Sequence, residues 1–197
     1  MGTSPTSQPV SAADPSQHHL VLVGLPGSGK STVGAKLARQ LGRDFLDFDA
    51  EITRRQRMSI TEIFAQHGEP HFRELEQALT LEVRNLENMV LAPGGGWVTR
   101  PETVSLLRPP ARLIYLRLSP GAALRRMGSR VEGRPLLQRP DPRGELDRLL
   151  AVRRVVYESA DIVIDVEHLY PQRVIERILA HIQSPPARPA RSDPAGG

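Results

Sequence analysis

Residues 24–31 of the chain read Gly-Leu-Pro-Gly-Ser-Gly-Lys-Ser, which fits the phosphate-binding pattern G-x-x-x-x-G-K-[ST], the P-loop. The apolar residues 20–23 before it are typical of a short buried strand, and the apolar spacing over 32–41 predicts a helix after it. In that setting, glycines let successive backbone N–H groups turn inward at the positive N-terminal end of the helix. The segment therefore predicts a nucleoside triphosphate site within an α/β fold.

The motif also predicts the chemistry of its side chains. Lys30 is expected to reach the β- and γ-phosphates, and the hydroxyl of Ser31 to be a ligand of Mg²⁺. A glycine-rich turn without any ligand is the alternative, and the Lys-Ser pair at the required offset disfavours it. The residues expected around the phosphates are Gly27, Ser28, Gly29, Lys30, Ser31 and Thr32.

The length and composition indicate one globular domain with two tails. The 197 residues favour a single domain at 18–183, while the Ser-, Pro- and Ala-rich ends at 1–17 and 184–197 predict disorder. Because the chain has no cysteine, disulfides and cysteine-bound metals are excluded, which fits a cytoplasmic protein. We see neither a secretory signal nor an apolar run long enough to span a membrane.

The positive charge of the chain raises the question of a nucleic-acid partner. The net charge is +4, but the arginines alternate with acidic residues, and aromatic residues make up only 4%, too few for base-stacking platforms. Binding of small anionic molecules explains the charge equally well. We expect no nucleic-acid partner.

Strand-like and helix-like segments alternate along the chain, which predicts a three-layer fold with a five-stranded parallel sheet flanked by helices. Ser59 with Glu62 and Thr99 with Glu102 fit capping boxes. Gly42 is a predicted helix end, and Pro120 after Ser119 a predicted helix start. The strands are expected near 20–24, 45–48, 89–93, 111–117 and 161–165.

Residues 125–142 scatter arginines among glycines and prolines. Such a segment is often a solvated loop. In a P-loop protein it also suits a mobile lid that closes over the phosphates and excludes water, and we predict the lid.

Five further motifs resemble the shikimate kinase family over about 18–183. Asp47-Phe48-Asp49 is similar to its D-x-D, and residues 68–76 to its G-E-x-x-F-R-x-x-E. Gly94-Gly95-Gly96 is similar to its glycine triplet, Arg134-Pro135-Leu136-Leu137 to its R-P-L-L lid, and Arg153 with Tyr157 to its R-x-x-x-Y helix. The resemblance implies a P-loop fold like that of the nucleoside-monophosphate kinases, and ATP-dependent phosphorylation of the 3-hydroxyl of shikimate, a step toward aromatic amino acids.

The resemblance also implies a role for each matching residue. Asp49 is expected to orient the accepting hydroxyl as a catalytic residue together with Lys30 and Arg134, and Asp47 to hold Mg²⁺ through water. The substrate carboxylate is assigned to Arg73 and Arg153, with Glu76 placed to pair with Arg73. The remaining assignments are substrate contacts at Gly94, Gly95 and Gly96, and ATP contacts at Arg126 and Arg134.

Two alternatives remain open at this point. One is a related kinase for gluconate or a nucleotide, and the other is a non-catalytic ligand sensor of the same fold. Pro93 and Trp97 flank the glycine triplet where the family has other residues, which bears on substrate identity. We expect a monomer with ATP and shikimate as its small-molecule partners.

Overall fold

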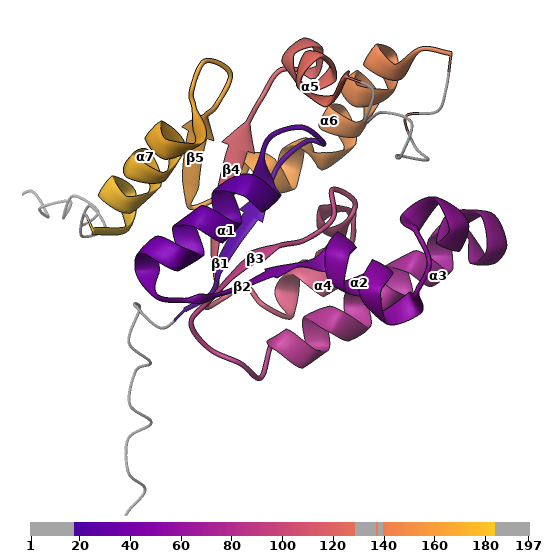
Figure 1. The fold of residues 1–197 in the computed structure, drawn as a ribbon, viewed down its shortest axis with the longest axis horizontal. Coiled ribbons are helices and arrows are strands. Elements are labelled where there is room, and N and C mark those ends of the chain that lie inside the picture. Colours follow the sequence, from indigo (N-terminus) through magenta and orange to yellow (C-terminus); the bar gives the residue numbers. More distant parts are fainter. Residues whose placement is uncertain (1–17, 129–136, 138–139, 184–197) are drawn as a thin grey trace, which may run out of the picture.

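The structure is a computed structural model that describes residues 18–128, 137 and 140–183. The tails predicted at 1–17 and 184–197, and most of the predicted lid, lie outside these residues. The elements in chain order are β1 (Leu20–Val23), α1 (Lys30–Leu41), β2 (Asp44–Asp47), α2 (Phe48–Gln56), α3 (Ile60–Val83), β3 (Met89–Ala92), the 3₁₀ helix η2 (Trp97–Thr99), α4 (Pro101–Ser105), β4 (Arg112–Arg117), α5 (Pro120–Met127), α6 (Pro142–Glu158), β5 (Ile162–Asp165) and α7 (Pro171–Gln183) (Figure 1).

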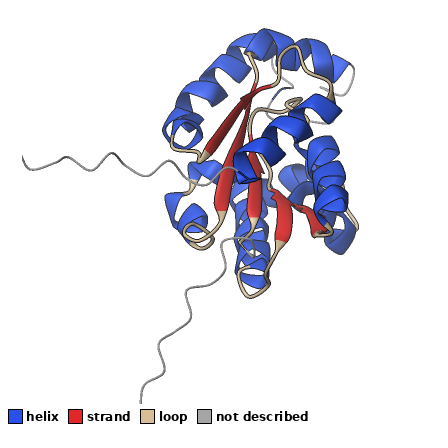
Figure 2. Cartoon of the chain, turned by 90° about the vertical axis from the view of Figure 1, so that its left-hand side faces the viewer, coloured by secondary structure: helices blue, strands red, loops and turns tan. Residues whose placement is uncertain are grey.

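The five strands form one sheet in the order β2-β3-β1-β4-β5, and every neighbouring pair is parallel. The predicted five-stranded parallel sheet is confirmed, with each strand within one residue of its expected start and end. Helices cover both faces of the sheet (Figure 2). All strands point the same way, so their carboxyl ends meet at one edge, where open α/β sheets bind ligands.

Alternate residues of β1 contribute to two separate cores. Leu20 and Leu22 join a buried cluster with α1, α5, α6 and α7, whereas Val21 and Val23 join a second cluster with α2, α3 and η2. Figure 1 shows α1 and α7 on one side of the sheet and α2, α3 and α4 on the other. Because both faces of this strand are covered, it is apolar throughout, as parallel strands generally are.

Three of the predicted helix ends are confirmed. Ser59 and Glu62 form a complete capping box at the start of α3. Ser119 accepts a hydrogen bond from the backbone N–H of Ala122 at the start of α5. Gly42 ends α1 in the left-handed region with φ 64°. These contacts are local, and sequence spacing therefore identifies them well.

The capping box predicted at Thr99 and Glu102 is wrong. The N-cap of α4 is Arg100, without any side-chain cap, and Pro101 is the first helical residue. The hydroxyl of Thr99 donates instead to the carbonyl oxygen of Gly96 at 2.6 Å. Thr99 belongs to the 3₁₀ turn after the glycine triplet, and its hydroxyl bonds within that turn.

Helix α3 is interrupted at Gly68, whose φ of 80° and ψ of 168° are not helical. Pro70 follows two residues later and cannot donate a backbone hydrogen bond, so the chain breaks one helix and starts another. The segment after the break carries Arg73 and Glu76. Among the described residues, no helix is long and apolar enough to cross a membrane.

Candidate nucleotide and acceptor site

A cavity of about 690 Å³ opens at the carboxyl edge of the sheet. It extends from the P-loop past the end of β2 to the segment that joins β5 to α7. Its lining includes Gly27, Ser28, Gly29, Lys30, Ser31, Thr32, Asp47, Asp49, Gly95 and Arg126. The structure thus brings all described members of the predicted nucleotide and metal sites to one cavity.

The P-loop is shaped by glycines and by the start of α1. Gly29 is the N-cap of α1 with φ 96°, and Lys30 is the first helical residue. At Gly27, where φ is 80°, a Cβ atom would lie 2.8 Å from the carbonyl oxygen of Ala123. A larger residue would therefore both strain the loop and push it from α5. The first N–H groups of a helix lack partners within the helix, so those of α1 are available to an anion in the cavity.

Two side chains of the loop add to this cradle. The hydroxyl of Ser28 is buried and has no hydrogen-bond partner. The ammonium of Lys30 lies back across the loop, with Nζ 2.9 Å from the carbonyl oxygen of Gly24 and 3.3 Å from that of Leu25. Backbone N–H groups, a hydroxyl and an ammonium are donors that suit phosphate oxygens.

Two carboxylates stand at the end of β2. Asp47 is the last residue of the strand and the N-cap of α2, where its Oδ1 accepts from the backbone N–H of Ala50 at 3.2 Å. The strand expected near 45–48 ends at Asp47 and α2 begins at Phe48, so Asp49 lies in the first turn of this helix. Among the described residues, no three His, Asp or Glu side chains are grouped to hold a metal.

Arg73 is buried between two carboxylates of its own helix. Its Nη1 lies 2.6 Å from Oε2 of Glu76, and its Nη2 lies 2.6 Å from Oε1 of Glu69. Burial raises the pKa of Glu76 to about 7, the charge of Arg73 opposes that rise, and nearby Asp49 adds to it. The predicted pairing of Arg73 with Glu76 is confirmed, and Oε1 of Glu76 remains buried with no hydrogen-bond partner.

Arg153 comes to the same place from α6. It is buried, and its Nε and Nη1 atoms have no hydrogen-bond partner. Burial lowers its pKa, whereas the adjacent Tyr157 favours the charged form. The ring of Tyr157 stacks on Tyr115 of β4 with centroids 4.5 Å apart, which fixes this part of α6 against the sheet. A buried guanidinium with unused donors is costly unless an anion joins it.

The glycine triplet lies against these charged side chains. A Cβ at Gly94 would be 2.5 Å from Oε1 of Glu76, and one at Gly95 would be 2.8 Å from Nη1 of Arg153. A Cβ at Gly96 would be 2.2 Å from the guanidinium carbon of Arg73. Gly94, Gly96, Arg73 and Arg153 are outside the cavity lining but adjoin it through Gly95. The loop therefore connects the two arginines to the cavity that holds the P-loop.

The loop between β5 and α7 was not predicted to belong to the site. Residues 166–171 also line the cavity. Arg126 of α5 donates from Nη2 to the carbonyl oxygens of Val166 and, at 3.1 Å, of Glu167. The loop follows the carboxyl end of a parallel strand, and this position was the one sign in the sequence that it would belong to the site. Arg134, predicted to be the lid arginine, lies outside the described residues.

The sheet order and the phosphate cradle at its carboxyl edge define a P-loop nucleotide-binding protein of the α/β class. The profile described as "Shikimate kinase" matches residues 26–183. A shikimate kinase of Pseudomonas savastanoi pv. phaseolicola is 43% identical over 171 residues, which cover 86% of this chain and 99% of that protein. The chain belongs to the shikimate kinase family.

Solved structures agree with this assignment. Shikimate kinase from Acinetobacter baumannii, solved in complex with shikimate, superposes with a TM-score of 0.79 at 36% identity. The match covers 84% of this chain and 92% of that one. A gluconokinase from Sinorhizobium meliloti gives a TM-score of 0.55 at 19% identity over 84% of this chain and 91% of that one. That second likeness extends to the fold alone. The predicted P-loop fold is confirmed, and so is the resemblance to the shikimate kinase family inferred from the motifs.

Proposed function

We propose that the chain transfers the γ-phosphoryl group of ATP to the 3-hydroxyl of shikimate, producing shikimate 3-phosphate and ADP. One observation carries this proposal. Two buried arginines from different helices, Arg73 and Arg153, meet at a glycine loop beside the P-loop cavity. A small carboxylate bound there would lie next to a site for nucleotide phosphates. The related structure solved with shikimate supports the same substrate.

The acceptor end of the site binds by charge and shape. A guanidinium presents donors in a flat fork that matches a carboxylate. We assign the shikimate carboxylate to Arg73 and Arg153. Gly94, Gly95 and Gly96 leave room for the ring to approach the backbone, and a side chain on any of them would collide with a charged group.

The reacting end of the site orients the hydroxyl and stabilises charge. Asp49 lines the cavity and would accept a hydrogen bond from the 3-hydroxyl, then its proton as the new bond forms. Lys30 would move from the carbonyl oxygens of Gly24 and Leu25 to the β- and γ-phosphates. We expect Arg134 to supply a second positive charge at the transferring group and Arg126 to lie along the adenine.

The donor set also fits Mg²⁺. This ion keeps most of its water and binds through few protein ligands together with substrate phosphates. Ser31 would provide a direct oxygen and Asp47 a water-mediated one. When bound, the ion neutralises charge on the phosphates.

A coupled assay of ADP release with shikimate, gluconate and AMP in parallel tests the proposal. We expect Mg²⁺-dependent release of ADP with shikimate as the acceptor, and none with gluconate or AMP. Turnover with gluconate or AMP but not shikimate would assign a different kinase activity. Binding of shikimate by calorimetry without any turnover would instead assign a ligand sensor. Light scattering on the same sample tests our expectation that the working unit is a monomer.

A further inference from the structure

Trp97 is the sole tryptophan of the chain and directly follows the glycine triplet. Its side chain is 1% exposed and belongs to the same buried cluster as Phe72 and Leu79 of α3. Its backbone N–H donates to the carbonyl oxygen of Gly94 at 3.0 Å, which closes the turn that contains the triplet. The position of the indole and the position of the glycine loop are therefore linked.

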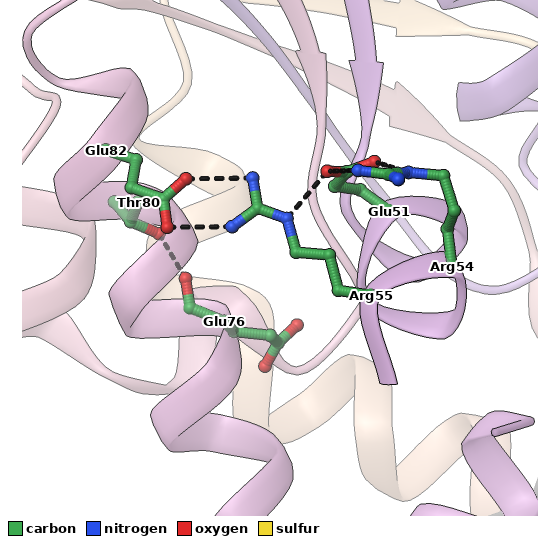
Figure 3. A network of polar contacts seen from close by, with 6 residues as sticks. All are labelled: Glu51, Arg54, Arg55, Glu76, Thr80 and Glu82. Carbon is green, nitrogen blue, oxygen red and sulfur yellow. Dashed lines mark hydrogen bonds and ion pairs between the residues drawn. The ribbon is translucent and has the colours of Figure 1, made fainter. Parts of the chain in front are cut away.

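A hydrogen-bonded chain leads from this indole into α3. Nε1–H of Trp97 donates to Oγ1 of Thr80 at 3.0 Å, and the hydroxyl of Thr80 donates to the backbone carbonyl oxygen of Glu76 at 2.7 Å. Thr80 is completely buried. Figure 3 shows the second of these bonds, with the carboxylate of Glu76 directed away from it. The hydroxyl uses its proton toward the helix and a lone pair toward the indole, so both partners are satisfied.

The distances at the glycine loop make this connection important for binding. Each glycine lies so close to Glu76, Arg153 or Arg73 that a Cβ atom would collide with a charged group. A small movement of the loop relative to α3 would therefore change the distances between these charged side chains and a bound ligand.

We infer that Trp97 and Thr80 are positioning residues that set the glycine loop against the Arg73–Glu76 pair, and thereby control affinity for shikimate. The inference rests on the proposed function. The indole fills the core beside the loop, and its N–H fixes the register between the loop and α3. Neither residue lines the nucleotide cavity, and binding of ATP should not depend on them.

The test separates the hydrogen bond from the packing. Thr80→Val keeps the shape of the side chain but leaves the buried indole N–H without a partner. Thr80→Ser keeps the hydroxyl and serves as the rescue variant. Thr103→Val is the matched control, because Thr103 is 2% exposed and its hydroxyl has no hydrogen-bond partner. Trp97→Phe removes the N–H donor itself, together with the part of the buried indole that a phenylalanine ring does not fill.

We expect Thr80→Val and Trp97→Phe each to raise KM for shikimate about fivefold, while KM for ATP changes less than twofold. Thr80→Ser and Thr103→Val should stay within twofold of wild type for both substrates. Because both changes break the same bond, the double variant should be no worse than the more severe single one. Unfolding midpoints measured on the same samples separate lost stability from lost affinity.

A second readout does not depend on turnover. A single tryptophan gives one indole N–H resonance in a ¹H–¹⁵N spectrum. In wild type this proton should exchange slowly with solvent, and the resonance should shift when shikimate is added. Thr80→Val should accelerate exchange and reduce that shift, whereas Thr103→Val should do neither.

The outcomes distinguish the two proposals. If wild type turns over shikimate but KM is unchanged in Thr80→Val and Trp97→Phe, only the positioning role is overturned. Equal increases in KM for shikimate and ATP would also overturn it, because they would indicate general loss of structure. Wild-type protein that neither binds nor phosphorylates shikimate would remove the proposed function and the inference together.

Discussion

Arg73 and Glu76 form an ion pair inside the protein, with Nη1 2.6 Å from Oε2 and side chains that are 8% and 2% exposed. The two residues are three positions apart on the segment of α3 that follows the break at Gly68, so the pair forms within one turn of helix. Burial at this depth makes each partner depend on the other, since an uncompensated charge in the interior is costly. Ionised Glu76 offsets the charge of Arg73 in this pair. When Glu76 is protonated, the guanidinium keeps its charge and only the ion pair with Glu69 offsets it.

Truncation of either buried arginine should weaken binding of shikimate. We expect Arg73→Ala or Arg153→Ala to cost roughly 2–5 kcal/mol, the range for removing one side of a buried charge pair. Lysine at either position should rescue poorly, because an ammonium lacks the flat fork of donors. Titration calorimetry measures the effect.

The neighbouring Arg154 provides the control for that measurement. Its side chain is 72% exposed and pairs with Glu158 on the outer face of α6. Arg154→Ala should leave shikimate affinity unchanged. Unchanged affinity in Arg73→Ala and Arg153→Ala as well would mean that the acceptor binds elsewhere.

Binding of shikimate near pH 7 should take up protons. Burial raises the pKa of Glu76 to about 7, so the carboxyl of Glu76 titrates close to neutral pH. A substrate carboxylate beside Arg73 would raise this pKa further, because a nearby negative charge favours the protonated form. Calorimetry in buffers of different ionisation enthalpy measures the uptake.

Glu76→Gln should abolish this proton uptake, since the amide does not titrate. Glu74→Gln serves as the control, because its side chain is 71% exposed on the same helix. An uptake that persists unchanged in Glu76→Gln would assign the proton to another group.

Substitution of the two acids at the end of β2, Asp47 and Asp49, should have different effects on catalysis. Asp49→Asn should retain the fold and nucleotide binding but lower kcat by about 10²–10⁴-fold, because the accepting hydroxyl loses its proton acceptor. Asp47→Asn should keep the helix cap, since asparagine caps as well as aspartate, and instead raise the Mg²⁺ concentration needed for half-maximal rate. Steady-state rates over a Mg²⁺ titration measure both. Equal losses that do not respond to Mg²⁺ would contradict this assignment.

Local rules made much of this fold predictable from the sequence. The spacing of the P-loop, the αL residue Gly42 after α1 and the capping box at Ser59 all depend on residues within one or two turns of each other. The pairing of Arg73 with Glu76 was predictable for the same reason. The roles of Asp47, Asp49, Arg126 and Arg134 at the reacting site stay predictions.

Other features depend on contacts that no local pattern contains. The bond from Trp97 to Thr80 joins residues 17 positions apart, and it forms because the sheet brings η2 onto α3. The elevated pKa of Glu76 depends on burial under the glycine loop, which sequence spacing does not report. The cavity wall at 166–171 comes from a connection whose residues have no motif. Thr99 satisfied the capping pattern in sequence but bonds within its own turn.

A buried histidine should make stability depend on pH. His19 accepts at Nδ1 from the backbone N–H of Met89 at 3.2 Å, so the ring must be neutral there, and its Nε2 lies 3.0 Å from the carbonyl oxygen of Val83. Burial lowers its pKa below the ordinary 6.5, and the charge of Arg43 lowers it further, whereas the carbonyl groups of Val83 and Leu86 and the carboxylate of Glu87 oppose the shift. The unfolded chain therefore binds more protons than the folded one just below pH 6.5, and stability should fall as pH falls through that window.

His19→Asn isolates this contribution, because the amide oxygen can still accept from Met89 but does not titrate. Above pH 6.5 we expect wild type to be more stable by about 1 kcal/mol, the usual value of the lost bond to Val83. The difference should shrink as pH decreases below 6.5 and level off once the folded-state pKa is passed. Urea unfolding between pH 5 and 8 measures it, and the comparison with the variant cancels the opposite trend from Glu76, whose raised pKa stabilises the fold as pH falls. If the difference in unfolding free energy between wild type and His19→Asn did not change with pH, the pKa of His19 would be the same in the folded and unfolded states.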